Sequence, residues 1–476
     1  MRRLPMEWTP EYCFRRMSSL PGCVWLDSSL ATSAANATET DESLGRYSYL
    51  AADPFSTLRI DKPQAGITDH LQRLCSRFFQ SRLPDLPPLQ GGWIGWFGYE
   101  FGGCFERVPL PAFNEFHLPL MVLGLYDTVL SWDHLLGQGW LISHGWPEFD
   151  PARRQQRAYR RLQSLMRRLE SPAATKPSAW QQTMRSQSIS QQQLAPQFET
   201  RRSPGWTSNY SPSGYRAAVA RLVEYIHAGD VFQTNLAQRL LRPATCSPEE
   251  LMLHLRQHSP APFAGYADFG RIQVISSSPE RFLRVEAGEI EARPIKGTRP
   301  RLTDPIADAG IAQLLLASDK DRSENVMIVD LLRNDLSRVA DPSSVQVASL
   351  CGLEKYPFVW HLVSVIRARL APGKSATDVL ACTFPGGSIT GAPKIRAMEI
   401  IAELEPTARG PYCGSLGYIS FAGDMDLSIL IRTVTASDGW WQVPVGGGIV
   451  ADSQPNLEEQ ETWHKAEGIL RAIDSL

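Results

Sequence analysis

The apolar residues of this 476-residue chain occur in short runs, and glycine, proline or charged residues bound each run. The longest run, at residues 118–126, includes Pro119 and is too short to cross a lipid bilayer. Runs at residues 23–26, 47–51 and 121–125 are typical of β-strands that end in turns. The pattern therefore predicts a strand-rich fold that also contains helices and does not span a membrane.

The composition changes after a helical pattern at residues 151–170. From residue 171 to about residue 203 the chain is rich in Ser, Gln and Pro and has almost no aliphatic residues, which predicts a linker or a long mobile loop. We therefore expect an N-terminal region at residues 1–170, a linker at residues 171–207 and a C-terminal region at residues 208–476.

The C-terminal region mixes helix and strand patterns. Ser213 is expected to cap a helix that runs to Ala228 and ends at Gly229. A second helix is expected at residues 395–403. Strands are expected at residues 272–276, 281–285, 417–421 and 427–435.

The charges are balanced, with 48 basic and 50 acidic residues and a formal net charge of −2. This balance predicts neither a nucleic-acid-binding surface nor a polybasic membrane-binding surface. The eight cysteines include no CxxC pair, which argues against a zinc ribbon or a dithiol redox site. The first residues lack the apolar core of a signal peptide, so we expect a cytoplasmic protein.

Two expected helices each carry a pair of acidic residues on one face. Asp321 and Glu324 lie three residues apart, shortly after Ser318, which is expected to cap their helix. Glu458 and Glu461 have the same spacing in the last helix of the chain. Carboxylates that meet from two helices would offer the oxygen ligands that suit Mg²⁺. The spacing alone leaves two ordinary solvated acidic faces as the alternative.

The segment around Lys296 is unusually rigid. Pro294 and Pro300 stiffen both of its sides, and Gly297 permits close approach of the backbone, so we expect a stiff loop. If Lys296 faces a partly dry pocket, its pKa falls and its amine can act as a nucleophile. A structural salt bridge is the alternative for an isolated lysine.

Glu280 follows the apolar strand expected at residues 272–276 and a proline, Pro279. A partly desolvated carboxyl at such a strand end would stay protonated and could serve as a general acid. An ordinary turn glutamate is the alternative.

Two glycine-rich stretches offer places where a ligand can approach the backbone. Residues 384–394 (FPGGSITGAPK) form a cradle before the helix expected at residues 395–403, and exposed amides there suit a carboxylate or a phosphate. Residues 444–450 (PVGGGIV) are expected to form a strand whose glycines admit a close ligand. Neither stretch has the GxxxxGK[ST] spacing, so neither is a P-loop.

Together these segments resemble the chorismate-utilising enzymes: component I of anthranilate synthase, component I of aminodeoxychorismate synthase, and the isochorismate and salicylate synthases. Residues 210–473 carry the strongest match, and residues 45–54 (GRYSYLAADP) and 91–100 (GGWIGWFGYE) resemble the N-terminal part of the aminating members. The resemblance implies an α+β fold, in which two large, mostly antiparallel β-sheets pack face to face with helices outside. It also implies that residues 208–476 bind chorismate and carry out catalysis.

The resemblance implies a role for each matched residue. Glu324 and Glu461 would bind Mg²⁺, supported by Asp321 and Glu458. Lys296, Glu280 and His361 would be the catalytic residues. The residues that hold the substrate would be Gly297, Thr298, Tyr412, Arg432, Gly446, Gly447, Gly448 and Lys394.

Two positions indicate the branch of the family. Lys296 stands where anthranilate and isochorismate synthases have alanine, and lysine there resembles aminodeoxychorismate synthase. Gln233 stands where isochorismate and salicylate synthases have a general-base lysine, so addition of water to the ring is disfavoured. The resemblance thus implies amination of chorismate to 4-amino-4-deoxychorismate through a covalent lysine intermediate, for p-aminobenzoate and folate biosynthesis. Anthranilate synthase component I and a non-catalytic, tryptophan-binding regulatory subunit are the alternatives.

The resemblance also implies partners. A separate glutamine amidotransferase subunit would supply ammonia, because no cysteine of this chain lies in the sequence context of such an enzyme. The aminating members of the family share a pocket for tryptophan. The positions that match this pocket are Ser28, Arg46, Tyr47, Pro262, Phe263 and Ala264.

Overall fold

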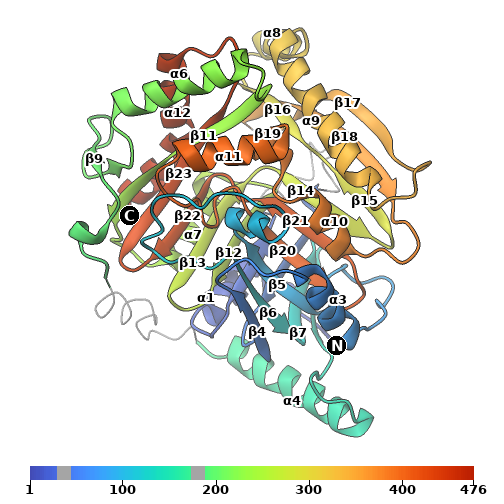
Figure 1. Cartoon of the computed structure of the whole chain (residues 1–476). Helices are drawn as coiled ribbons and strands as arrows, with labels where there is room; N and C mark the ends of the chain where they lie inside the picture. The colour runs from blue at the N-terminus through green and yellow to red at the C-terminus, as the bar shows by residue number, and fades with distance from the viewer. Residues whose placement is uncertain (29–43, 173–187, 357) are drawn as a thin grey trace.

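The structure, a computed structural model, describes residues 1–28, 44–172, 188–356 and 358–476. Two large β-sheets form its centre, and helices lie around them (Figure 1). Adjacent strands run antiparallel in both sheets. The predicted α+β architecture of two large, mostly antiparallel sheets with helices outside is therefore confirmed.

The larger sheet has 13 strands and combines strands from both ends of the sequence. In spatial order they are β1 (Arg2–Arg3), β8 (Gln138–Ser143), β7 (Thr128–Asp133), β3 (Tyr47–Ala51), β2 (Val24–Asp27), β12 (Phe263–Asp268), β13 (Ile272–Ser278), β22 (Thr433–Ser437), β23 (Trp440–Ile449), β11 (Gln233–Pro243), β10 (Thr207–Ser208) and β9 (Phe198–Glu199), with β19 (Gly391–Ala392) paired to β11. Because β2 pairs with β12, the N-terminal and C-terminal regions share one continuous sheet.

The smaller sheet has ten strands and is also built from both regions. In spatial order they are β16 (Ile295–Pro300), β18 (Val359–Arg369), β15 (Glu289–Ala292), β14 (Arg281–Glu286), β21 (Met425–Ile429), β20 (Ser415–Ser420), β5 (Gly92–Phe97), β6 (Met121–Tyr126) and β4 (Ser56–Ile60), with β17 (Gln346–Lys355) paired to β18. The strand that carries Lys296, β16, therefore lies at one edge of this sheet.

The helices cover the outer faces of the sheets (Figure 1). The α-helices are α1 (Pro10–Met17), α3 (Ile67–Arg77), α4 (Pro151–Glu170), α6 (Pro212–His227), α7 (Pro248–His258), α8 (Pro305–Leu316), α9 (Asp319–Ser337), α10 (Ala376–Thr383), α11 (Lys394–Leu404) and α12 (Pro455–Asp474). The described residues also form the 3₁₀ turns η1 (Tyr99–Cys104), η2 (Gln191–Gln193) and η3 (Gly387–Ile389).

Alternation along the strands explains how each sheet buries two faces. On β13, Val274 belongs to the apolar cluster between the sheets, together with Ile94 and Leu416 of the smaller sheet. The next residue, Ile275, points the other way into the cluster beneath the helices of the larger sheet. Successive side chains of a strand point to opposite faces, so a strand with helices on one side and a sheet on the other is apolar throughout. Each such buried side chain contributes about 1.5–3 kcal/mol.

The two acidic helices form as expected. The Ser318 hydroxyl accepts a hydrogen bond from the Asp321 amide at the start of α9, and Pro455 occupies the first turn of α12. Helix α9 packs on β16 and β18 of the smaller sheet, whereas α12 packs on β23 of the larger one. The two helices therefore bring acidic residues toward the same region from different sheets.

Two local predictions were wrong. The helix α6 is capped by Ser211 and not by Ser213, because the Ser211 hydroxyl accepts from the Gly214 amide and Pro212 already occupies the first turn. Residues 427–435 do not form one strand, because the chain turns between β21 and β22 and Arg432 adopts a φ of 49°. Apolar residues on both sides of the turn concealed it in the sequence.

Part of the predicted linker lies outside the described residues, namely residues 173–187. Its remaining residues include η2, β9 and β10, and β10 pairs with β11. The division into residues 1–170, 171–207 and 208–476 stays a prediction.

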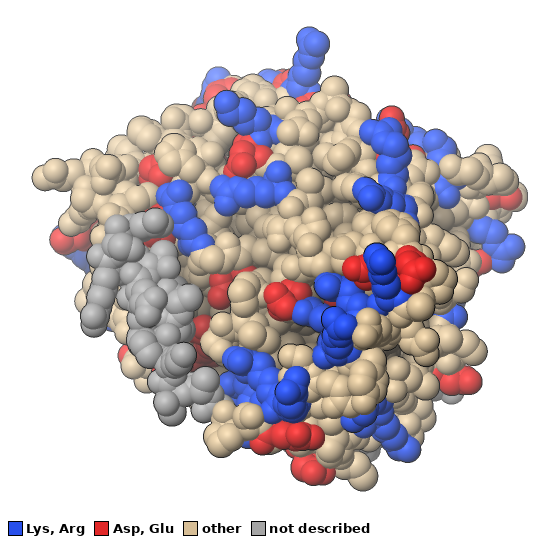
Figure 2. All heavy atoms as spheres, turned by 90° about the horizontal axis from the view of Figure 1, so that it is seen from below, with Lys and Arg blue, Asp and Glu red and all other residues tan. Residues whose placement is uncertain are grey.

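No helix among the described residues is long and apolar enough to cross a membrane. On the face seen in Figure 2, lysine and arginine side chains lie among aspartate and glutamate side chains. This face therefore carries charges of both signs.

Candidate active site

Lys296 lies on β16, which is a strand and not the stiff loop that the prolines suggested. The pairing of β16 with β18 is irregular between Lys296 and Thr298, where Gly297 has a φ of 78°. A Cβ atom at Gly297 would lie 3.0 Å from Asp321 of α9, so only glycine fits this close approach without strain. The irregularity falls directly after Lys296, which still pairs with Leu362 of β18.

The amine of Lys296 is largely withdrawn from solvent, with 12% of its side chain exposed. Its Nζ lies 3.5 Å from the carbonyl oxygen of Ser388 and 3.9 Å from a carboxylate oxygen of Glu324. Burial lowers the pKa of Lys296, although the charges of Glu324 and Glu280 oppose the shift. A larger fraction of this lysine is therefore uncharged than of an ordinary surface lysine.

Glu280 lies between β13 and β14 and is 6% exposed. Its Oε1 accepts a hydrogen bond from the Ser388 hydroxyl at 2.9 Å. Burial raises the pKa of Glu280 to about 7, while the Ser388 hydroxyl and the charge of Lys296 limit the rise. A carboxyl with this pKa can hold a proton at neutral pH and release it to a substrate.

Helix α12 brings a second set of charges to the glycine strand β23. A Cβ atom at Gly447 would lie 3.3 Å from Glu461 and 3.7 Å from Glu458. Glu461 pairs with Lys465 at 2.7 Å, and Glu458 accepts from Ser453 at 2.6 Å.

The two carboxyls of α12 differ in their ionisation. Burial raises the pKa of Glu458. Burial also favours the neutral form of Glu461, but the nearby ammonium groups, that of Lys465 first, outweigh it and lower the pKa of Glu461. Glu461 is therefore held as a carboxylate.

The carboxylates suit a magnesium ion. Glu461 lies near cationic side chains, and the Glu324 side chain is 17% exposed beside Lys296. The charge of Glu461 acts on Lys296, which places α12 within electrostatic range of the β16 amine. Within the described ranges no three His, Cys, Asp or Glu residues form a ready-made metal cluster. Two carboxylates completed by an anionic substrate and water match the ligands that Mg²⁺ prefers.

Arg432 supplies a cation without an ion-pair partner among the described residues. It lies between β21 and β22, and the residue is exposed. The surrounding protein lowers the pKa of Arg432 by desolvation. A guanidinium in this state is suited to a bidentate grip on a carboxylate.

The remaining predicted substrate contacts lie close to these groups. The Thr298 hydroxyl is 2.8 Å from Nδ1 of His361, and burial lowers the pKa of His361 to about 4, so its ring is neutral at pH 7. Tyr412 precedes Cys413, whose amide donates to Leu430, two residues before Arg432. On β23, a Cβ atom at Gly446 would meet the Leu236 carbonyl at 2.4 Å.

Gly448 faces a polar side chain that the structure leaves without a partner. A Cβ atom at Gly448 would lie 2.4 Å from the amide nitrogen of Gln233. Gln233 is 1% exposed, and neither of its amide atoms has a hydrogen-bond partner among the described residues. Gln233 was noted in the sequence only through the resemblance.

Lys394 is engaged elsewhere. Its ammonium donates to Asp335 at 2.7 Å and to the Thr383 carbonyl at 2.6 Å. These contacts tie the start of α11 to α9, so the substrate-binding role of Lys394 stays a prediction without support from its contacts.

Sequence reasoning missed two polar residues of the site, Ser388 and Asn235. The Asn235 amide donates to the Ser388 carbonyl at 3.1 Å, and Ser388 contacts both Glu280 and Lys296. Ser388 lies within the glycine-rich stretch 384–394, but that stretch was interpreted as a set of backbone amides. The sequence signal that could have identified Ser388 is its hydroxyl side chain, which lies between Gly387 and Gly391.

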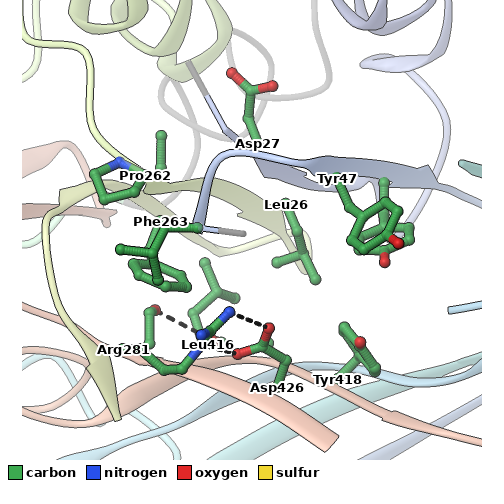
Figure 3. A pocket seen from close by; sticks show the side chains of 14 residues that line it. Leu26, Asp27, Tyr47, Pro262, Phe263, Arg281, Leu416, Tyr418 and Asp426 are labelled. Atoms are coloured by element: carbon green, nitrogen blue, oxygen red, sulfur yellow. Dashed lines mark hydrogen bonds and ion pairs between the residues drawn. The ribbon is translucent and has the colours of Figure 1, made fainter. Parts of the chain in front are cut away.

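A second pocket opens between the two sheets, away from Lys296 (Figure 3). Of the residues predicted to hold tryptophan, Tyr47, Pro262, Phe263 and Ala264 line it. Arg46 precedes Tyr47 in the chain, and Ser28 follows Asp27, which also lines the pocket. Arg46 pairs with Asp133 at 2.7 Å.

Charged residues of the pocket are already paired. Arg281 binds Asp426 through two contacts of 3.1 Å, and its guanidinium lies 5.0 Å from the Phe263 ring centre (Figure 3). On the opposite wall, Asp27 accepts from Arg256 at 2.8 Å and from the Ser48 hydroxyl at 2.8 Å.

Comparison with known proteins agrees with this geometry. A family model described as chorismate binding enzyme matches residues 30–471. Aminodeoxychorismate synthase component 1 of Escherichia coli is 40% identical over 98% of this chain and 96% of that protein. Anthranilate synthase component 1 of Thermus thermophilus is 39% identical over 85% of this chain and 83% of that protein.

A solved structure is also similar. The crystal structure of anthranilate synthase component I from Streptococcus pneumoniae has a TM-score of 0.76 and 30% identity, over 92% of this chain and 93% of that chain. The resemblance inferred from the motifs is therefore confirmed.

Proposed function

Because the chain belongs to the family of chorismate binding enzymes, we propose that it is the chorismate-aminating component 1 of an aminodeoxychorismate synthase. It converts chorismate and ammonia to 4-amino-4-deoxychorismate and water, a step toward p-aminobenzoate and folate. The observation that carries the proposal is Lys296, a withdrawn amine beside a protonatable Glu280.

Overall identity does not separate the two aminating enzymes, because relatives of both kinds are 39–40% identical to this chain. The residue at position 296 does separate them. An anthranilate synthase adds ammonia directly at ring carbon 2, and a lysine amine at that place would compete with it. An enzyme that aminates carbon 4 can use the same amine as a temporary nucleophile.

We assign the binding of substrate and metal to charged side chains and to glycines whose backbone a ligand can approach closely. Arg432 holds a carboxylate of chorismate, and Gly446 to Gly448 let the substrate approach β23. Glu324 and Glu461 hold Mg²⁺, with Asp321 and Glu458 as supporting acids. When bound, the ion withdraws electron density from the ring carboxylate.

The reaction proceeds in two substitutions. The neutral amine of Lys296 forms a bond to carbon 2, the double bonds shift, and the bond from carbon 4 to its hydroxyl breaks. Glu280 gives its proton to the departing hydroxyl, which leaves as water, and the new ammonium of Lys296 releases a proton in turn. Ammonia then bonds to carbon 4, the shift reverses, and the bond from Lys296 to carbon 2 breaks. The new ammonium on carbon 4 gives up one proton, and the departing Lys296 amine takes one up. His361, which is neutral, orients Thr298 beside the ring.

A partner amidotransferase supplies the ammonia. The name of the Escherichia coli relative, component 1, implies a second component. A glutaminase needs a reactive thiolate, and burial raises the pKa of Cys13, Cys75 and Cys382 to about 12, which disfavours a thiolate at these three positions. We place the enzyme in the cytoplasm with its partner.

The pocket between the sheets is proposed to bind tryptophan. The aromatic and proline side chains of Tyr47, Pro262 and Phe263 suit the indole ring.

The proposal is tested by incubating the purified chain with chorismate, Mg²⁺ and an ammonium salt. Mass spectrometry is expected to detect 4-amino-4-deoxychorismate, which no lyase in the mixture converts further. Lys296→Ala is expected to lose this activity, whereas Lys374→Ala, at an exposed lysine, is expected to retain it.

Omission of ammonium provides the second readout. The intact mass of the wild-type chain should then rise by that of the ring adduct, and the Lys296→Ala chain should show no increase. Fluorescent anthranilate as the product would establish the anthranilate synthase alternative. Absence of turnover even with an amidotransferase partner would establish the regulatory one.

A further inference from the structure

Ser388 is hydrogen-bonded to both Lys296 and Glu280. Its hydroxyl donates to Oε1 of Glu280 at 2.9 Å. Its carbonyl oxygen accepts from Nζ of Lys296 at 3.5 Å. The 3₁₀ turn η3, which carries Ser388, lies between α10 and β19 in the chain.

The turn has little freedom to move. A Cβ atom at Gly387 would lie 2.6 Å from Leu331 of α9, and one at Gly386 would lie 2.8 Å from Ile429 of β21. The Thr390 hydroxyl closes the turn by donating to the Gly386 carbonyl at 2.8 Å. Close packing on both sides therefore holds Ser388 in place.

The carbonyl of Ser388 is fixed from a third direction. The side chain of Asn235 donates to it at 3.1 Å, and the backbone amide of Asn235 donates to the Thr390 carbonyl at 2.8 Å. Arg409 donates to the neighbouring Ile389 carbonyl at 3.0 Å. The acceptor that faces Lys296 is thus anchored to β11 and to a buried arginine.

On the basis of the proposed function, we infer that Ser388 is a positioning residue that sets the nucleophile Lys296 and the acid Glu280 at a fixed relative placement. The two groups act at different carbons of one ring, so neither can be useful unless the other is aligned at the same time. A single rigid residue that holds both meets this requirement.

Each contact also directs the chemistry. A neutral amine that donates one N–H to the Ser388 carbonyl has its lone pair directed away from that oxygen and free for attack. A hydroxyl that donates to Oε1 favours a proton on the other oxygen of Glu280, since a protonated carboxyl carries its proton on one oxygen and accepts on the other. Ser388 thereby selects the oxygen that delivers the proton.

The groups that face the Glu280 carboxyl are the Ser388 hydroxyl, the Lys296 amine and the Ile295 backbone amide. Only the Ser388 hydroxyl can be removed without changing a charge or the strand β16. Ser388→Ala is therefore the informative variant.

The experiment measures steady-state amination of chorismate by the full chain, with saturating Mg²⁺ and ammonium, as a function of pH. Ser388→Ala is expected to lower kcat about 10- to 100-fold, the usual effect of losing a hydrogen bond to an ionisable group. KM for chorismate should not change, because the hydroxyl does not contact Arg432 or the β23 glycines. The high-pH midpoint of kcat should move upward, because the hydroxyl stabilises the Glu280 carboxylate.

Three further variants test whether the effect belongs to the hydroxyl. Ser388→Thr retains a hydroxyl and is expected to restore kcat and the midpoint toward wild type. Ser388→Cys keeps the size of the side chain but donates a weaker hydrogen bond, so an intermediate kcat is expected. This variant keeps the test informative if Ser388→Ala folds poorly. Thr390→Val removes a hydroxyl from the same turn without touching Glu280, and its pH midpoint should equal that of wild type.

Two results would overturn the inference. One is a wild-type kcat and midpoint in both Ser388→Ala and Ser388→Cys. The other is an equal midpoint shift in Thr390→Val, which would assign the effect to the shape of the turn. Failure of the proposed function is distinguishable, because the wild-type chain itself would then form no 4-amino-4-deoxychorismate.

Discussion

The site around Lys296 and the pocket around Arg281 both contain buried charged residues, but the two differ in how those charges are paired. Arg281 has Asp426 and Glu291 within 3.1 Å, and Asp27 has Arg256 and Ser48 within 2.8 Å. Among the described residues, the polar partners of the Lys296 amine are a carbonyl at 3.5 Å and a carboxylate at 3.9 Å. The contrast is sharpest at one peptide bond, because Glu280 and Arg281 are consecutive residues that face different sites.

The difference separates chemistry from binding. Close, complete pairing keeps charged groups in their ordinary ionisation states, which suits a pocket that holds a ligand unchanged. Long or missing contacts combined with burial shift pKa values toward neutrality, and groups in that state can exchange protons or attack a substrate. Alternation along β14 and its preceding turn directs one residue to each environment.

The largest effect should come from Glu280→Gln, which keeps the shape of the acid and removes its proton. We expect kcat to fall about 10²- to 10⁴-fold, the usual contribution of general acid catalysis. Steady-state kinetics with chorismate and ammonium measures this loss. A kcat near wild type would show that another group protonates the departing hydroxyl.

The same variant should change how stability depends on pH. The pKa of Glu280 is raised from an ordinary 4.5 to about 7 in the folded state, so its protonated form stabilises the fold. This contribution is complete below pH 4.5 and is lost as the pH rises to about 7. Urea unfolding should therefore show a wild-type stability that falls relative to Glu280→Gln across this window. A constant difference would mean that Glu280 has an ordinary pKa.

Arg432→Lys should have the next largest effect, because lysine cannot make the bidentate contact. We expect kcat/KM for chorismate to fall about 10- to 100-fold. The thermal midpoint should change little, since Arg432 has no ion-pair partner to lose among the described residues. A loss of stability without a change in kcat/KM would contradict its role in holding substrate.

Asp27→Asn should have the opposite effects, with a loss of stability and no change in catalysis. Removing the charge opposite Arg256 is expected to lower the free energy of unfolding by about 2 kcal/mol, because hydrogen bonds between charged groups are lost from a buried site. The kcat for amination should remain that of wild type. Urea unfolding and steady-state kinetics on one preparation measure both quantities, and a fall in kcat would show that the pocket influences the chemistry.

The smallest effect should come from Glu289→Gln. Its partner Arg369 is 71% exposed and Glu289 is 56% exposed, so solvent screens the pair. The free energy of unfolding should change by less than about 0.5 kcal/mol. This variant sets the baseline against which the buried pairs are judged, and a change as large as that of Asp27→Asn would mean that burial does not distinguish them.

Much of the local structure could be predicted from the sequence. Residues 151–170 form α4 as expected, Ser318 caps α9, and the strands at residues 272–276 and 281–285 appear as β13 and β14. These signals are local, since caps, apolar spacing and turn residues act within a few positions. The motifs also carried the family resemblance, which implied the two-sheet architecture.

The chain by itself therefore determined much of the local secondary structure, the family and the identity of its unusual residues, including Lys296 and Glu280. Tertiary structure alone decided that Lys296 lies on a paired strand, that Lys394 is committed to Asp335, and that Ser388 joins the amine to the acid. The physical reason is that burial and hydrogen bonding depend on neighbours about 90 positions away, and these determine whether a lysine is an ordinary cation or a nucleophile.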